Sequence, residues 1–436
     1  MFTRVLALED LTRDQREHLM TRSETDISDL LDYVTPLTER VRLEGDAAVR
    51  ALTLEFDKVD LGDLPLKVTE AEFDTAEARL EPDVKAAIEL AIANIVKVHE
   101  DQLGSPEIKT NVMPGVTVGE RILPLQSAAL YVPRGKGSFP SVVMMLAIPA
   151  KVAGVEQTMI ITPPGRGGEV DDATLFVARR VGVSAVYRVG GVQGVAAVAH
   201  GTESIPKALK VLGPGNSYVT AAKRALSTVI DPGIPAGPSE AAILVDDSVD
   251  PRLAAHDMLI EAEHGPDSCV LLVATSEKTA QAIAEIADSL LANLPEQRQA
   301  FIRENFKDRS RIVWTEDFDS AVNFVNAFAA EHLEILTEDP EAVLPRITNA
   351  GEIMLGSLAP ITLGNFVAGS NAILPTGGLA RSRSCLGVPD FQKRSSFVHV
   401  NQEGFDAIAP AAVTLAEYEG FPAHAAAVKA RFDQKA

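Results

Sequence analysis

The amino-acid sequence predicts an α/β protein with two parallel sheets, an α-helical N-terminal part and a helical C-terminal tail. From residue 128 onward, short apolar runs end in Gly or Pro and are followed by stretches with helical spacing. This alternation is typical of parallel sheets that carry helices on both faces. Within the first hundred residues, by contrast, apolar residues recur at intervals of three and four, which is the period of amphipathic helices.

The composition is that of a globular protein and excludes several functional classes. The chain has 436 residues, of which 46% are hydrophobic, and its formal net charge is −21. This length suffices for two or more hydrophobic cores, and an acidic surface repels nucleic acid. No apolar run approaches the roughly 20 residues that a membrane-spanning helix needs, and the first ten residues do not form a secretory signal. We therefore expect a cytoplasmic protein without a nucleic-acid or membrane partner.

Cysteine usage excludes a disulfide framework and a zinc ribbon. The only cysteines are Cys269 and Cys385, and neither has a partner at metal-ligand spacing. Cys269 begins an apolar run that is typical of a buried strand.

The expected elements define three domains. Helices are expected at 39–54 and 83–98, strands of a first sheet at 128–133, 159–164, 185–190 and 209–213, and strands of a second sheet at 241–246, 269–274 and 332–336. We expect 128–236 to form a Rossmann-like domain, and 1–127 with 237–381 to form a larger α/β domain. Residues 382–436 are expected to form a tail, helical from 408 to 432, that docks on the same chain or on a partner subunit.

One candidate metal site lies at the end of an expected helix. Asp250 is a good N-cap, Pro251 suits the first helical position, and Gly265 with Pro266 stops the helix. Glu261 and His264 are three residues apart, which places two potential ligands of a divalent ion on one helix face. A solvated Glu and a His that caps the helix would explain the same pattern, and a zinc site needs at least two further ligands.

A second pair, Glu331 and His332, stands at an expected junction between a helix and a strand. The two side chains are proton acceptors of different basicity, as alcohol oxidation and attack by water both require. Taken alone, an adjacent Glu-His pair is weak evidence, because such pairs also occur on ordinary surfaces.

Two glycine-rich loops, at 189–194 and 212–217, each follow an expected strand and open a helix. Backbone amides at a helix N-terminus bind pyrophosphate well. Neither loop fits G-x-G-x-x-G, so each could also be a tight turn without a ligand.

Taken together, these segments resemble the histidinol dehydrogenase family over nearly the whole chain. The matching stretches are, in order, 131–133, 189–193, 213–216, 235–240, 262–268, 330–335, 374–378, 390–394 and 419–424. The resemblance implies a homodimer that oxidises a primary amino alcohol through the aldehyde to the carboxylate, with two NAD molecules used in sequence and one zinc ion per active site. The default substrate is L-histidinol, which is converted to L-histidine in histidine biosynthesis.

The resemblance also implies site residues, position by position. The residues matching NAD contacts are Tyr131, Gln193 and Asn216, and those matching the zinc ligands are Glu261, His264, Asn365 and His424. The residues matching substrate contacts are Ser239 and Glu419, together with His332 and the four zinc ligands. Glu331 and His332 match the two proton acceptors: His332 would accept the hydroxyl proton, and Glu331 would activate water to attack the aldehyde. The tail would reach the active site of the neighbouring subunit.

Four positions depart from the family pattern. Glu261 stands where the family has Gln and Asn365 where it has Asp, so the anionic and neutral zinc ligands are exchanged. Ala372 replaces a His near the substrate, and Arg134 replaces a Gly and adds a cation near the expected cofactor or substrate entrance. These changes keep open a paralogue that acts on another small polar alcohol, such as dihydroxypropanesulfonate. A non-catalytic binding relative is a further alternative, disfavoured because Glu331 and His332 are retained. A metal-dependent hydrolase would leave the glycine loops unexplained.

Overall fold

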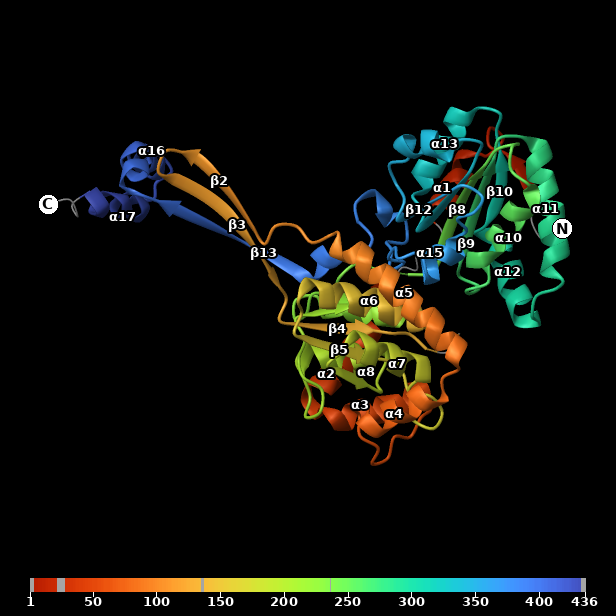
Figure 1. Ribbon diagram of the computed structural model, residues 1–436, viewed down its shortest axis with the longest axis horizontal. Helices are drawn as coiled ribbons and strands as arrows, with labels where there is room; N and C mark the ends of the chain where they lie inside the picture. The colour runs from red at the N-terminus through yellow and green to blue at the C-terminus, as the bar shows by residue number, and fades with distance from the viewer. Residues whose placement is uncertain (1–3, 22–27, 135–136, 236, 433–436) are drawn as a thin grey trace. The chain divides into compact units, whose positions relative to one another are not determined.

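The structure is a computed structural model that describes residues 4–21, 28–134, 137–235 and 237–432 (Figure 1). The chain divides into two compact units. The first consists of Met1–Gln102 with Leu125–Phe391, and the second consists of Leu103–Pro124 with Gln392–Ala436. The predicted α/β class with two parallel sheets is confirmed, because the first unit contains one sheet of six strands and one of four, both parallel. Among the described residues, no helix is long and apolar enough to cross a membrane.

The six-stranded sheet has the order β1-β10-β9-β8-β11-β12. Its strands are β1 (Val5–Ala7), β8 (Glu240–Val245), β9 (Cys269–Ala274), β10 (Arg311–Trp314), β11 (His332–Leu336) and β12 (Glu352–Leu355). Strands β8, β9 and β11 are buried throughout, as parallel strands covered on both faces must be. Of the predicted strands, 241–246, 269–274 and 332–336 are confirmed, whereas β1, β10 and β12 were not expected.

Helices cover both faces of this sheet. Along β8, Ala241 and Ile243 pack into one apolar cluster, and Ala242 and Leu244 into another. The first cluster includes residues of α10 (Pro251–Ala262), α11 (Glu277–Leu291), α12 (Glu296–Asp308) and α15 (Ile361–Phe366), and the second includes residues of α1 (Arg13–Thr21), α13 (Phe318–Phe328) and α14 (Pro340–Val343). The sheet is thus the middle layer of three.

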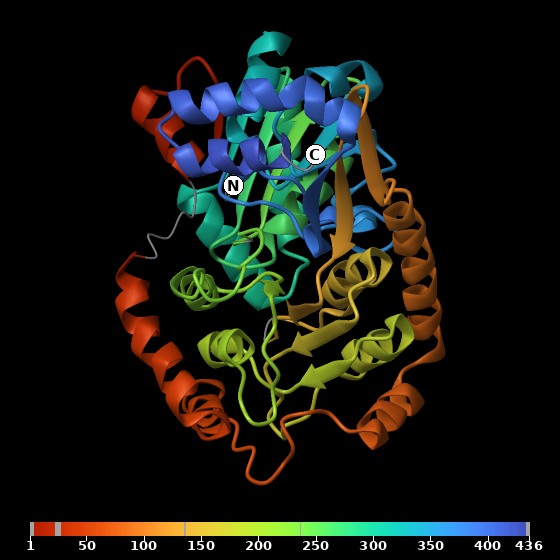
Figure 2. The ribbon, with the colours of Figure 1, turned by 90° about the vertical axis from the view of Figure 1, so that its left-hand side faces the viewer.

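The four-stranded sheet has the order β6-β5-β4-β7. Its strands are β4 (Ser127–Tyr131), β5 (Gln157–Ile161), β6 (Ala185–Tyr187) and β7 (Lys210–Leu212), which confirms all four predicted strands of the first sheet. Figure 2 shows helices on both of its faces. One face packs against α4 (Glu70–Arg79), α5 (Pro82–Glu100), α6 (Pro140–Ala153) and α7 (Asp172–Val181), and the other against α2 (Ser28–Glu44), α3 (Asp46–Leu52), α8 (Gly191–His200) and α9 (Ser217–Ala225).

The N-terminal helices therefore cover the four-stranded sheet. The sequence-based division placed residues 1–127 in the same domain as the six-stranded sheet. That division into domains stays a prediction. Among the described residues of this segment, β1 pairs in the six-stranded sheet and α1 packs on it, whereas α2, α3, α4 and α5 pack on the four-stranded sheet. An amphipathic pattern shows that a helix has a buried face without showing which sheet buries it.

The helix expected at 39–54 is interrupted. Helix α2 ends at Glu44, and α3 begins at Asp46 and leads into a π-helical turn, η1 (Thr53–Asp57). Between α2 and α3, Gly45 has a φ of +57°. Residues with a Cβ rarely adopt this φ, and a Cβ here would also meet the carboxylate of Glu203, so the position strongly favours glycine.

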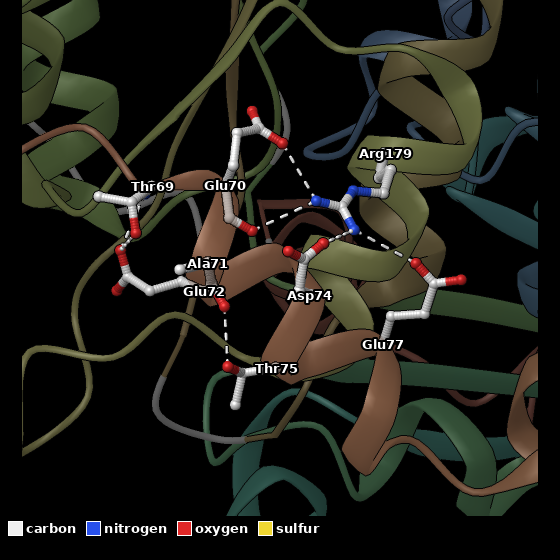
Figure 3. A network of polar contacts seen from close by, with 8 residues as sticks. All are labelled: Thr69, Glu70, Ala71, Glu72, Asp74, Thr75, Glu77 and Arg179. Carbon is white, nitrogen blue, oxygen red and sulfur yellow. Dashed lines mark hydrogen bonds and ion pairs between the residues drawn. The ribbon is translucent and has the colours of Figure 1, made fainter.

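A network of ion pairs holds α4 against α7 (Figure 3). Arg179 of α7 pairs with Glu70, Asp74 and Glu77 of α4. At the N-terminus of α4, the carboxylate of Glu72 accepts hydrogen bonds of 2.9 Å from both the backbone N–H and the hydroxyl of Thr69. Both carboxylate oxygens of Glu72 also accept from one nitrogen, Nη2, of the buried guanidinium of Arg188, each over 2.8 Å.

The second unit is an antiparallel three-stranded sheet followed by two helices. Strand β3 (Val116–Pro124) lies between β2 (Glu107–Met113) and β13 (Gln392–Val400), and α16 (Gln402–Tyr418) and α17 (Pro422–Phe432) follow. The predicted helical tail is confirmed as these two helices, but the strands were not expected. All residues of β2 are exposed, so the strand lacks the apolar run by which buried strands are recognised.

Removing the carboxylate of Glu72 should destabilise the protein strongly. The guanidinium of Arg188 is 1% exposed, and a buried charge that loses its partner typically costs about 3 kcal/mol or more of unfolding free energy. We expect this loss for Glu72→Ala in urea unfolding. Glu70→Ala is the matched control, because Glu70 is 88% exposed in its pair and such pairs contribute less than about 1 kcal/mol. Equal losses for the two variants would contradict the assignment.

Candidate active site

The first cluster of candidate residues lies at the edge of the six-stranded sheet where the strands begin. Helix α13 ends at Phe328, and Ala329 turns the chain in a left-handed conformation with a φ of +52°. Glu331 follows in the turn, and His332 is the first residue of β11. In the parallel register, His332 lies between Ala241 of β8 and Glu352 of β12. Three strands therefore start around this histidine.

His332 is buried between carboxylates. Its Nδ1 lies 3.1 Å from Oε2 of Glu352, and its Nε2 lies 3.9 Å from Oε1 of Glu261. Burial by itself lowers the pKa of the imidazole, but the hydrogen bond with Glu352 and the negative charges around the ring outweigh burial and raise the pKa. The ring therefore holds a proton more tightly than an exposed histidine does.

Glu331 is also buried, and its Oε2 accepts a hydrogen bond of 2.9 Å from the backbone N–H of Glu240. Burial raises the pKa of Glu331 well above its ordinary value, and the charge of His332 opposes this rise. A carboxyl group with a raised pKa beside an imidazole can take up and release a proton near neutral pH. Ser239 precedes Glu240 and is half-buried next to this contact.

Glu261 comes to the same edge from α10. Asp250 caps this helix through the N–H of Arg252, and Pro251 is its first residue, as predicted. The spacing had suggested that His264 lies on the last turn of the helix. The helix ends at Ala262, however, so His264 lies just beyond it. The backbone N–H of His264 still bonds the carbonyl of Glu261, which keeps the two side chains together.

Two further predicted metal ligands, His264 and Asn365, contact the buried carboxylate of Glu261. Nδ1 of His264 lies 3.3 Å from its Oε2, and Nδ2 of Asn365, in α15, donates to its Oε1 over 3.2 Å. His264 also bonds the carbonyl of Ile260 through Nδ1 over 3.1 Å, which leaves Nε2 available, the usual arrangement of a metal-binding histidine. The carboxylate of Glu261 and the imidazole of His264 fit the donor preferences of zinc, and the amide of Asn365 has an oxygen that could add a further ligand.

Among the predicted ligands that meet here, only one is a carboxylate, that of Glu261, and only one is an imidazole, that of His264. Across the described ranges, no group of three or more His, Cys, Asp or Glu side chains is placed to hold a metal. The fourth predicted ligand, His424, belongs to the second unit, where its ring lies 5.3 Å from that of Phe421. Glu419 belongs to the same unit and follows α16. The roles of both residues stay predictions.

The predicted NAD contacts gather at the carboxyl edge of the four-stranded sheet. Tyr131 ends β4, and its hydroxyl accepts a hydrogen bond of 3.2 Å from the N–H of Gly191. Gln193 is buried in the first turn of α8. Asn216 caps α9 by accepting a hydrogen bond from Val219. Carboxyl edges of parallel sheets are where nucleotides commonly bind.

The loop at 212–217 is fixed by close contacts. A Cβ at Gly213 would collide with the carbonyl oxygen of Tyr131, so the two segments approach as only glycine permits. The buried ammonium of Lys223 donates to the carbonyl of Gly213 over 2.6 Å, and burial lowers its pKa to about 8.

Two departures from the family pattern have defined surroundings. The guanidinium of Arg134 bonds the carbonyl and the carboxylate of Glu169, at 2.7 and 3.0 Å, so its charge is already paired. Ala372 packs against the apolar cluster on one face of the four-stranded sheet, and its N–H points to the sulfur of Met145.

Sequence reasoning missed Glu352 and Asp57. Glu352 belongs to the four-residue strand β12, which has only one buried residue and therefore no recognisable pattern. Asp57 ends the π-helical turn and accepts a hydrogen bond from Gln193. Neither residue stands in a motif, and only the fold brings them to the site.

Comparisons with known proteins cover nearly the whole chain. The family model for histidinol dehydrogenase matches residues 20–432. A histidinol dehydrogenase from Synechocystis sp. is 44% identical over 429 residues, covering 98% of this chain and 99% of that protein. A histidinol dehydrogenase homolog from Cereibacter sphaeroides is 50% identical over 424 residues, covering 97% and 96%. The crystal structure of histidinol dehydrogenase from Elizabethkingia anophelis matches with a TM-score of 0.93 at 32% identity, covering 99% of this chain and 98% of that chain.

The contact between Glu352 and His332 predicts a measurable change in the histidine. Glu352→Gln removes the charge that stabilises the imidazolium, so the pKa of His332 should fall by on the order of one unit or more. The titration can be followed by NMR of carbon-13-labelled histidine in metal-free protein, with the signal assigned through His332→Asn. Glu341→Gln, an exposed change elsewhere in the same unit, should leave the titration unaltered. An unchanged pKa in Glu352→Gln would show that this contact does not control the ring.

Proposed function

This chain belongs to the histidinol dehydrogenase family, and we propose that it oxidises L-histidinol through the aldehyde to L-histidine with NAD as the hydride acceptor. The observation that carries the proposal is the buried pair Glu331 and His332 beside Glu261 at one sheet edge. A non-catalytic relative would have no use for a titratable pair that is costly to bury.

The two proton acceptors have separate tasks in this proposal. In each of the two oxidations, the reacting carbon loses a hydride to one NAD molecule while the oxygen loses a proton. In its neutral form, His332 accepts the hydroxyl proton of the alcohol at Nε2, while Glu352 holds the ring through Nδ1. Glu331 then takes a proton from water as the oxygen attacks the aldehyde, which forms the hydrate that is oxidised second. Because the pKa of Glu331 is raised, its ionised carboxylate binds a proton more strongly than an ordinary Glu does, which suits this role as a base.

Zinc and NAD are part of the proposal. Glu261, His264, Asn365 and His424 would hold zinc, which would supply Lewis-acid polarisation of the substrate oxygen. Tyr131, Gln193 and Asn216 would contact NAD. Ser239, half-buried beside the Glu240–Glu331 contact, would contact the substrate.

A homodimer is proposed because two of these residues lie in the second unit. Glu419 and His424 would act in the active site of a neighbouring subunit, as the family resemblance implies. The unit has exposed apolar side chains that a second subunit would cover, with Tyr418 at 90% and Val398 at 66% exposed. Exposed apolar groups of this size, gathered in one unit, favour a protein partner.

A second candidate function is oxidation of another small polar alcohol, such as dihydroxypropanesulfonate. It is favoured by Ala372, which packs among apolar groups and offers no side-chain hydrogen bond to an imidazole substrate. Pockets built for polar partners discriminate strongly against analogues that leave those partners unpaired. Two relatives with identities of 48% and 50% are themselves named homologs of histidinol dehydrogenase.

The stoichiometry of NADH tests the proposed function. Purified full-length protein is incubated with NAD and L-histidinol, with and without a chelator. We expect two NADH per substrate consumed, and loss of activity after chelation. Turnover of dihydroxypropanesulfonate without turnover of L-histidinol would select the second candidate. No turnover of either compound, or of a panel of primary alcohols, would contradict both.

The exchanged ligands predict how zinc retention responds to mutation. Glu261→Gln leaves two neutral amides in place of one carboxylate and one amide, so we expect zinc affinity to fall by about tenfold or more. The double variant Glu261→Gln with Asn365→Asp restores one carboxylate beside one amide and should regain affinity. Zinc per chain is measured by elemental analysis after dialysis against a graded chelator series. Equal zinc content in the parent and Glu261→Gln would contradict the assignment.

A further inference from the structure

Asp57 is held against the four-stranded sheet by an irregular turn. The π-helical turn η1 ends at Asp57, and Lys58 then reverses the chain in a left-handed conformation with a φ of +59°. Val59 and Leu61 anchor the following segment in the apolar cluster beneath α8 and α9. π-Helical turns widen the helix by one residue and are frequent at functional sites.

The side chain of Gln193 connects this turn to the predicted NAD loop. Its Nε2 donates to Oδ2 of Asp57 over 3.0 Å. Its Oε1 is buried and has no hydrogen-bond partner among the described residues. A buried amide oxygen without a donor is costly and rare in native proteins, so its presence points to a ligand that supplies the donor.

The unpaired oxygen lies above a glycine. A Cβ at Gly191 would stand 2.7 Å from Oε1 of Gln193, and Gly191 has a φ of +61°. The N–H of Gly191 is bonded to the hydroxyl of Tyr131. Oε1 of Gln193 therefore lies at the start of α8, close to Tyr131, which is another of the predicted NAD contacts.

We propose that Asp57 is a positioning residue for NAD: it fixes the orientation of the Gln193 amide so that Oε1, and not Nε2, faces the dinucleotide and accepts a hydrogen bond from it. An amide can rotate to present either its oxygen or its nitrogen, and an ionised carboxylate accepts only the nitrogen side. The inference rests on the proposed contact between Gln193 and NAD. The donor on the ligand is an N–H of the nicotinamide carboxamide or a ribose hydroxyl.

The charge of Asp57 fits this role. Burial raises its pKa to about 6, and the hydrogen bond from Gln193 opposes the rise. The group is therefore mainly ionised above neutral pH. Its charge also contributes to the raised pKa of Tyr131, which burial brings to about 12, so this hydroxyl remains protonated as a neutral neighbour.

The test exchanges the two polar groups. In Asp57→Asn, the new amide can pair with either side of Gln193, so we expect the KM for NAD and the dissociation constant for NADH to rise by about tenfold while kcat at saturating NAD changes little. Gln193→Glu places two carboxylates together and should weaken NAD binding further. The double variant Asp57→Asn with Gln193→Glu should recover most of the loss, because the amide now donates and one carboxylate oxygen again faces the ligand.

Controls separate this inference from the proposed function. Glu55→Gln, an exposed change in the same turn, should leave NAD binding unaltered. An analogue whose nicotinamide carries an acetyl group in place of the carboxamide identifies the donor. If the penalty of Asp57→Asn disappears with this analogue, the donor is the carboxamide, and if it persists, the donor is a ribose hydroxyl.

Two results would overturn the inference. If the parent protein binds NADH and Asp57→Asn has the same KM and dissociation constant, Asp57 does not position the cofactor. The same follows if the double variant binds no better than Gln193→Glu. If the parent neither binds NADH nor reduces NAD, the proposed function fails, and this inference fails with it.

Discussion

The candidate site depends on one constraint, the parallel direction of all six strands in the larger sheet. A parallel sheet requires every connection to return the chain to the same edge before the next strand begins. At this edge β8, β11 and β12 begin with Glu240, His332 and Glu352, and the last turn of the crossover helix α10 places Glu261 beside His332. Residues separated by more than a hundred positions in the sequence therefore meet without a dedicated loop. Nucleotide sites usually occupy the opposite, carboxyl edge, where the smaller sheet carries Tyr131 and the glycine turns.

The sequence allowed prediction of the elements whose pattern is strong. Strand β9 is a continuous apolar run, and α5 is long and periodic, so their positions could be predicted closely. Strand β12 has four residues of mixed exposure, which carry no such pattern. For the same reason Glu352 was missed, although it contacts the ring of His332. The position of Glu331 and His332 at a helix-to-strand junction was predictable, but their partners depend on strand register.

Acidic groups accumulate around this edge beyond those that the proposed chemistry uses. Glu334 is fully buried two residues after His332, and burial, together with the nearby charge of Asp257, raises its pKa well above its ordinary value. Burial likewise raises the pKa of Asp257, to about 6. Groups of one sign in a low-dielectric interior oppose folding unless a proton or a cation compensates them. Burying these acidic groups therefore costs folding stability. Hydrogen bonds from backbone N–H groups, such as that of Ile361 to Glu334, offset part of this cost.

The second unit is built from two distant pieces of the chain, and this has a consequence for how the protein could be shortened. Strand β3 is the central strand, and its outer partner β13 arrives more than 260 residues later. A chain that stopped before β13 would retain β2 and β3 as a two-stranded ribbon with a newly unpaired edge, and isolated ribbons of this kind are marginal in water. The unit is therefore not a detachable appendage. Loss of the C-terminal segment would also remove the outer partner of β3, and would therefore destabilise strands that lie in the first third of the sequence.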